Sequence, residues 1–110
     1  MRRLKVEVDE LKEKIISILG KIEFEGHFDV IIANTGNGFH ESIISWVMDC
    51  KERRIGPEHS TKFKNILGFL FKPRNTRYRA ILVKEKNKYF LILFLDKHKY
   101  YERERERLGI

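Results

Sequence analysis

The sequence predicts an α+β fold in which a small, twisted and mainly antiparallel sheet is packed by two or three helices. Apolar residues recur at helical spacing in two stretches of the first half, and the second half holds "RYRAILV" and "YFLILFL", whose β-branched and aromatic residues favour strands. A chain of 110 residues with 42% apolar residues is the size of one small core, and no linker divides it. We therefore expect a single domain, residues 1–110, with 1–26 as an N-terminal helical segment and 27–110 as the α+β core.

The first half is expected to hold two helices with a strand between them. Residues 2–8, "RRLKVEV", alternate well enough for a short strand or a lead-in, and Asp9 can cap the helix that follows. That helix should end near Gly20, and "HFDVIIAN" (27–34) alternates as a strand, which the turn "NTGNG" stops. A second helix should then run to about Arg54. The apolar positions that define the helices are Leu11, Ile15, Ile18, Leu19 and Ile22 in the first and Phe39, Ile43, Trp46, Val47 and Cys50 in the second.

Strands dominate the expected second half. In "KFKNILGFLF" the pattern leaves two alternatives open, a short helix capped by Ser60 or a strand entered by a bend at Gly68. "RYRAILV" and "KYFLILFL" are predicted strands joined by "KEKNK", a polar hairpin loop. The second strand is apolar on both faces, so it should be central, with helices on one side and further chain on the other. After Asp96 we expect a fraying tail or a short helix, in which Glu102 with Arg105 and Glu104 with Arg107 form favourable pairs.

The cysteine count and the lengths of the apolar runs argue against a disulfide-linked, zinc-binding, membrane-spanning or secreted protein. Cys50 is the single cysteine, so no internal disulfide forms, and no Cys/His spacing matches a zinc site. The longest apolar runs are far shorter than the roughly 20 residues of a membrane helix, and no apolar stretch behind the basic start resembles a secretory signal. We therefore expect a cytoplasmic protein that uses no metal or cofactor and makes no membrane contact.

The glycine-rich turn before the second helix can in principle offer helix N–H groups to a phosphate. A dinucleotide fingerprint needs glycine where Glu41 stands, and the Gly-Lys-Ser/Thr of a P-loop is absent. The Glu41 carboxylate would also repel the anion. A tight connection is the stronger interpretation.

The net charge of +7 is concentrated in the second half of the chain. Residues 1–54 hold nine Lys/Arg against ten Asp/Glu, a net of −1, and residues 55–110 hold fourteen against six, a net of +8. A nucleic-acid backbone is the polyanion that such a surface would meet through phosphate contacts, whereas a generally basic surface that aids solubility is the simpler alternative. The segment 62–79 contains no acid and carries Lys62, Lys64, Lys72, Arg74, Arg77 and Arg79.

A second feature is the segment "DKHKYY" that follows the last strand. Cleaving RNA without a metal requires a proton to leave the 2′-OH, the phosphorane charge to be neutralised and the leaving 5′ oxygen to be protonated. A histidine near pH 7 together with arginine and lysine side chains supplies these functions. The hairpin register pairs Arg77 and Arg79 with residues of about 93–96, close in sequence to His98, so we expect these cations to share one sheet edge with His98.

Each candidate residue also has a structural interpretation. His98 can be a surface histidine, Arg79 can snorkel or pair with Asp96, and the tyrosines can be packing residues instead of stacking on unpaired bases. The remaining histidines are isolated in sequence and are interpreted as loop or helix-surface residues. The candidate catalytic residues are Arg79, His98, Lys64 and Tyr101, and the candidate nucleic-acid-binding residues are Lys62, Lys72, Arg74, Arg77, Lys97, Lys99 and Tyr100.

The order "KNILG", "RYRAILV", "KEKNK", "YFLILFL" and "KHKYYER" over about residues 55–105 resembles the RelE/ParE superfamily of toxin–antitoxin toxins. The resemblance implies a RelE-like fold, endonucleolytic cleavage of messenger RNA, often within the ribosome, an acidic antitoxin as partner and no cofactor. By position, Arg79 matches the arginine of the family's "YR" strand, Lys62 and Lys64 match the basic residues before it, and His98 with Tyr100 or Tyr101 matches residues of the tail. Members begin with a strand followed directly by a helical hairpin, whereas this sequence places its predicted strand between the helices.

Two other functions remain open at this point. One is a non-catalytic nucleic-acid-binding or protein-interaction module that uses the same basic face. The other is a toxin that acts on a topoisomerase, because branches of the superfamily poison DNA gyrase. A fold alone does not separate these activities.

Overall fold

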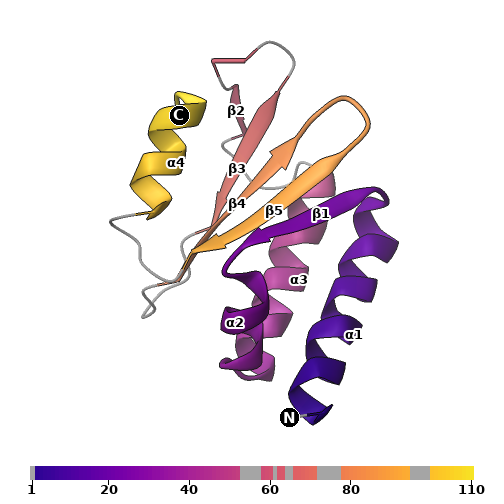
Figure 1. Ribbon diagram of the computed structural model, residues 1–110. Coiled ribbons are helices and arrows are strands. Elements are labelled where there is room, and N and C mark those ends of the chain that lie inside the picture. Colours follow the sequence, from indigo (N-terminus) through magenta and orange to yellow (C-terminus); the bar gives the residue numbers. More distant parts are fainter. Residues whose placement is uncertain (1, 53–57, 61, 64–65, 72–77, 95–99) are drawn as a thin grey trace.

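The structure is a computed structural model that describes residues 2–52, 58–60, 62–63, 66–71, 78–94 and 100–110 (Figure 1). It has the predicted α+β fold. No helix in these ranges has the length and apolar character needed to cross a membrane. The elements along the chain are α1 (Arg2–Leu19), β1 (Ile22–Gly26), α2 (Phe28–Ala33), α3 (Asn37–Glu52), β2 (Glu58–Ser60), β3 (Leu67–Phe71), β4 (Arg79–Lys84), β5 (Tyr89–Phe94) and α4 (Tyr100–Leu108).

The strands form one mixed sheet in the order β1-β5-β4-β3-β2. Strands β2 to β5 are antiparallel neighbours in chain order, as a meander of hairpins requires. The strand β1 joins the sheet beside β5 in parallel, with Ile22 opposite Tyr89 and Gly26 opposite Leu93. The sheet is therefore mainly antiparallel, as predicted, and β5 lies inside it between β1 and β4.

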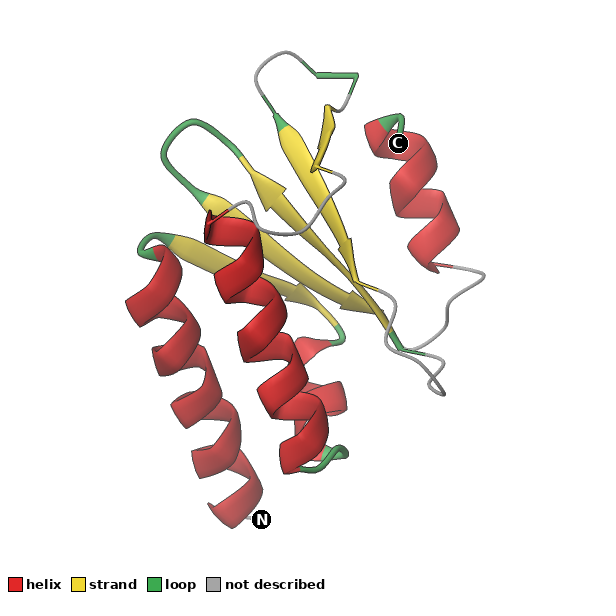
Figure 2. Ribbon diagram, turned by 180° about the vertical axis from the view of Figure 1, so that it is seen from behind, coloured by secondary structure: helices red, strands yellow, loops and turns green. Residues whose placement is uncertain are grey.

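Helices cover both faces of the sheet. Figure 2 shows α1, α2 and α3 together against one face, with α4 apart from them on the other. Successive side chains of a strand point to opposite faces, so β4 and β5 each contribute to both cores. Ala80, Leu82, Leu91 and Leu93 pack toward α1, α2 and α3, while Ile81, Val83, Ile92 and Phe94 pack with Tyr101 and Leu108 of α4. The prediction that β5 is covered by helices on one side and by further chain on the other is confirmed.

The segment 28–33 is a helix and not the predicted strand. Phe28, Ile31 and Ile32 are buried at helical spacing, whereas Val30 is 52% exposed. Short apolar runs do not distinguish a strand from a helix by periodicity alone. The carbonyl groups at the end of α2 accept hydrogen bonds from Asn34 Nδ2 and Thr35 Oγ1, at 2.7 Å to Val30 and Ile31 respectively. These side chains satisfy carbonyl oxygens in the last turn of α2 that have no partner within the helix, and they define where this short helix ends.

The N-terminal 26 residues differ from the prediction in two further respects. Residues 2–8 belong to α1, so Asp9 lies inside the helix and does not cap it. The segment 22–26, which we assigned to the helical region, is the strand β1, with Ile22 and Phe24 packed on the α1 side and Glu23 and Glu25 exposed. The alternation of these four residues is the signal for a strand with one buried face.

Other predicted elements are confirmed. The helix α1 ends at Leu19, and the next residue, Gly20, has φ +85°. The helix α3 buries Ile43, Trp46, Val47 and Cys50 at the predicted positions. The hairpin closes with a hydrogen bond of 2.8 Å from the N–H of Glu85 to the carbonyl oxygen of Lys88. Of the two alternatives for residues 62–71, the strand is correct from Leu67 onward, and the segment after Asp96 includes a short helix, α4.

Candidate functional site

Arg79 begins β4 on the face of the sheet that α4 covers. It shares this face with Ile81 and Val83 because alternate residues of a strand point the same way. Its Cα pairs with that of Phe94, the last residue of β5, within the range that the hairpin register predicted. The side chain is half-buried, and Nη1 donates a hydrogen bond of 2.7 Å to the carbonyl oxygen of Tyr78. Arg79 therefore lies at the end of the sheet where the chain leaves β5.

Tyr101 brings the first turn of α4 close to Arg79. Its side chain is only 2% exposed, and its ring lies edge-on to that of Phe94, with the centroids 5.8 Å apart. Burial raises the pKa of the Tyr101 hydroxyl, and the positive charges of Arg105 and Arg79 act against that rise. The hydroxyl is thus neutral near pH 7, and it lies close enough to Arg79 for that positive charge to lower its pKa.

The two tyrosines have different surroundings. The buried ring of Tyr101 cannot stack on a base while α4 is packed on the sheet, whereas Tyr100 is 44% exposed. The ring of Tyr100 lies edge-on to that of His27, with centroids 5.4 Å apart, and the backbone N–H of His27 donates to the carbonyl oxygen of Leu93 at 2.9 Å. Of the two stacking candidates, Tyr100 is the accessible one. No spacing in the sequence signals the His27 contact, because it depends on the pairing of β1 with β5.

Lys62 lies at the opposite end of α4. Its backbone N–H donates to the carbonyl oxygen of Leu108 at 2.8 Å, and its ammonium lies 5.5 Å from the ring centroid of Phe63. Tyr101 and Leu108 stand near the two ends of α4, a separation of about 10 Å along a helix axis. The structure therefore places Lys62 away from Arg79. The expectation that Arg77 and Arg79 share a sheet edge with His98 stays a prediction, because Arg77 and His98 lie outside the described residues.

Arg105 is a neighbour of the site that sequence reasoning missed. Its guanidinium carbon lies 5.7 Å from the ring centroid of Tyr101, and the pair with Glu102 has a separation of 3.7 Å. Within the described part of the chain, the buried Nε of Arg105 and the hydroxyl of Tyr101 have no hydrogen-bond partner. The four-residue spacing from Tyr101 to Arg105 is the signal that could have indicated the contact.

The remaining predicted site residues fall outside the ranges that the structure describes, and their roles stay predictions. The described part of the site is thus Arg79, Tyr100 and Tyr101 at one end of α4. Among the described residues, no group of three His, Cys, Asp or Glu side chains could hold a metal ion. The residues outside the described ranges are Lys64, Lys72, Arg74, Arg77, Lys97, His98 and Lys99.

Cys50 is interpreted as a packing residue, and the structure allows a test of that interpretation. The side chain is 3% exposed, and burial, with a smaller contribution from Asp49, raises the pKa of its thiol from 9.0 to about 12. The thiolate is the reactive form, so the native protein should not react with a thiol reagent at pH 8.

The thiol should react fully once the protein is unfolded in urea, as followed by mass increase after alkylation. Because the unfolded thiol ionises near pH 9 and the folded one does not, stability should also fall as the pH rises from 9 toward 12. Stoichiometric labelling of the native protein at pH 8 would show that Cys50 is accessible and that the packing interpretation is wrong.

Comparison with known proteins does not assign the chain to a family. No family model, curated protein or solved structure matches it.

Proposed function

We propose that this protein is a metal-independent endoribonuclease of the RelE kind, which cleaves messenger RNA through attack of a 2′-OH on the neighbouring phosphorus. The position of Arg79 is the observation that supports it most directly. Arg79 pairs with the last residue of β5, and its positive charge interacts with the hydroxyl of Tyr101 in the first turn of α4. In the sequence, Lys97, His98 and Lys99 lie between these two points.

The proposed reaction needs three kinds of group. The 2′ oxygen attacks phosphorus as it loses its proton, a 2′,3′-cyclic phosphate forms, and the bond to the 5′ oxygen breaks as that oxygen takes up a proton. In this proposal Arg79, with Lys64, stabilises the phosphorane, and His98 transfers the protons. Tyr100 stacks on a base. Tyr101 is buried and contributes through its electrostatic interaction with Arg79.

The order of the described elements also supports the proposal. The strand β1 is followed directly by the helices α2 and α3, and then by β2 to β5. A strand followed by a helical hairpin is the order that the resemblance to the RelE/ParE superfamily implies. The sequence predicted a strand at 28–33, between the two helices, which the family does not have. Because this segment is the helix α2, β1 is followed by two helices as in the family. The helix α1 lies before this shared order of elements.

The proposal includes the family's partners. The proposed substrate is RNA, including messenger RNA bound to a ribosome, and the proposed partner is an acidic antitoxin protein that covers the basic face. The charge of +8 on residues 55–110 favours both polyanions.

Cleavage of a labelled single-stranded RNA in the presence of a chelator tests the proposed reaction, and the products should carry 2′,3′-cyclic phosphate and 5′-OH ends. His98→Ala should lower the cleavage rate by about 10²-fold or more and leave RNA affinity nearly unchanged, because its role is proton transfer. Arg79→Ala should lower the rate by about 10²–10³-fold through lost charge stabilisation. An RNA with a 2′-deoxy sugar at the scissile position should stay intact.

Lys86→Ala is the matched control for Arg79→Ala, because Lys86 is an exposed cation in the hairpin loop at the other end of β4. Its cleavage rate should equal that of the unmodified protein. Growth arrest on expression, relieved by Arg79→Ala, would agree with the biochemical result. If neither free nor ribosome-bound messenger RNA is cleaved, the proposal is wrong.

A non-catalytic nucleic-acid-binding or protein-interaction module is the second candidate, and the burial of Tyr101 favours it. A ring that is 2% exposed contacts no substrate directly, and α4 itself carries three arginines and three glutamates and so adds no net charge. RNA that binds in a salt-dependent manner without being cut, with affinity lowered by Arg79→Ala, would identify this function. Inhibition of supercoiling with RNA left intact would instead identify a topoisomerase poison.

A further inference from the structure

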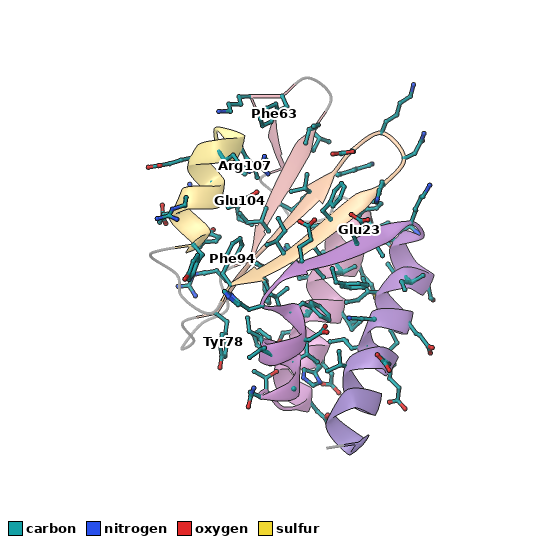
Figure 3. All side chains as sticks on the ribbon, viewed as in Figure 1. Glu23, Phe63, Tyr78, Phe94, Glu104 and Arg107 are labelled. Carbon is teal, nitrogen blue, oxygen red and sulfur yellow. The ribbon has the colours of Figure 1, made fainter. Side chains whose placement is uncertain are left out.

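His27 continues a row of residues that runs across the sheet to Arg79. Its backbone N–H donates to the carbonyl oxygen of Leu93 at 2.9 Å, which extends the pairing of Gly26 with Leu93 by one residue. The next residue of β5 is Phe94, which pairs with Arg79 of β4 and which Figure 3 shows beside the first turn of α4. Neighbouring strands lie about 4.8 Å apart, so the Cα atoms of His27 and Arg79 are about 10 Å apart, with Phe94 between them.

The imidazole of His27 lies on the same side of the sheet as Arg79. Phe94 belongs to the core that α4 covers, and Arg79 shares that face with Ile81. The His27 ring lies edge-on to that of Tyr100 in the first turn of α4, with the centroids 5.4 Å apart. His27 and Arg79 therefore flank Phe94 from two sides, next to the start of α4.

One nitrogen of the His27 ring can reach a substrate. The side chain is half-buried, and Nδ1 is enclosed without a hydrogen-bond partner among the described residues. The other nitrogen, Nε2, also makes no hydrogen bond to these residues, but it is not enclosed. In His40, by contrast, Nε2 lies 3.0 Å from the carbonyl oxygen of Ile32 and 3.1 Å from Thr35 Oγ1. Of these two histidines, His27 has the nitrogen available for proton transfer.

Cleavage through a 2′-OH involves two proton transfers, one on each side of the phosphorus. The attacking 2′ oxygen and the leaving 5′ oxygen stand in line, so the group that takes the first proton and the group that gives the second act from opposite sides. A single imidazole would have to serve both oxygens in turn. Two imidazoles that flank the arginine-bound phosphate serve them in one step.

We propose that His27 is a second catalytic histidine, which carries one of these two proton transfers while His98 carries the other. The inference rests on the proposed ribonuclease function. In the step, one neutral imidazole takes the proton of the 2′-OH as the bond from the 2′ oxygen to phosphorus forms. The other histidine, as imidazolium, gives its proton to the 5′ oxygen as the bond from phosphorus to that oxygen breaks, and exchange with solvent restores both rings.

His27→Phe separates proton transfer from packing, because it keeps a ring beside Tyr100 and removes both nitrogens. The rate of RNA cleavage should fall by about 10²-fold, while RNA affinity should change by less than about twofold. His27→Gln, which is polar but transfers no proton, should show the same loss. Unchanged thermal unfolding of both variants shows that the loss arises at the site.

His59→Phe is the matched control, because His59 lies in β2, at the opposite edge of the sheet from β1. Its cleavage rate should equal that of the unmodified protein. Full activity of His27→Phe, or of His27→Gln, would overturn the inference and leave the proposed function standing. RNA left intact by the unmodified protein would overturn both.

An RNA in which sulfur replaces the scissile 5′ oxygen tests the division of the two transfers. Sulfur leaves as a thiolate and needs no proton, so the variant that lacks the proton donor should cleave this RNA within about threefold of the unmodified protein. Only one of His27→Phe and His98→Ala should recover in this way. Recovery of both variants, or of neither, would show that the two histidines do not divide the transfers, and the inference would be wrong.

Discussion

Gly26→Ala is expected to lower the free energy of unfolding by about 2–5 kcal/mol. Gly26 has φ +70°, where a side chain costs energy in the backbone alone. A Cβ atom there would lie 2.5 Å from the carbonyl oxygen of Leu93 and 3.1 Å from the side chain of Ile92. Because both neighbours belong to β5, a strand inside the sheet would have to move.

Gly20→Ala separates backbone strain from steric conflict. Gly20 also has a positive φ, +85°, but no atom lies within 4 Å of the position its Cβ would take. It should lose only the backbone contribution of about 1–2 kcal/mol. Urea unfolding followed by the fluorescence of Trp46, the single tryptophan, measures both variants. Equal losses would mean that β1 does not approach β5 as closely as the structure shows.

Tyr101→Ala is expected to cost about 3–5 kcal/mol in the free energy of unfolding, because it removes a fully buried ring that links α4 to the sheet. The ring packs edge-on to Phe94, and the Arg105 guanidinium lies beside it. Loss of the ring leaves a cavity beneath the first turn of α4. Amide hydrogen exchange in α4 should then accelerate more than exchange in α3, which packs on the other face of the sheet.

Tyr101→Phe should behave in the opposite way. The hydroxyl is buried without a hydrogen-bond partner among the described residues, so its removal should be neutral or should raise the free energy of unfolding by up to about 1 kcal/mol. The same urea unfolding experiment compares it with Tyr101→Ala. A loss of 2 kcal/mol or more in Tyr101→Phe would reveal a partner for the hydroxyl outside the described residues and would contradict the prediction.

Local patterns were sufficient where one face or one turn decides the structure. The spacing of Ile43, Trp46, Val47 and Cys50 places a single buried stripe on α3, and the polar loop at 84–88 closes the hairpin in the predicted register. The pairs of Glu102 with Arg105 and of Glu104 with Arg107 follow from helical spacing once α4 forms. These features depend on residues a few positions apart.

Patterns failed where distant segments decide the structure. Taken alone, the sequence at 28–33 fits a strand or a helix. It is a helix because three apolar side chains at helical spacing are buried in the core. The short strand β1 is defined by its pairing with β5, more than sixty residues away. The contact of His27 with Tyr100 follows from that pairing, and so it could not be expected from either residue's neighbours.

The amino-acid sequence by itself determined the α+β class, the helix α3, the hairpin of β4 and β5 and the uneven distribution of charge, because propensity, periodicity and net charge are properties of neighbouring residues. The tertiary structure alone decided that β1 pairs in parallel with β5, that α4 buries Tyr101 beside Arg79 and that Lys62 stands at the far end of that helix. Burial and electrostatic proximity depend on which distant surfaces pack together. The proximity of Arg79 and Tyr101, the two candidate catalytic residues within the described ranges, is therefore a property of the packed sheet and helices, and not of the order in which the residues occur.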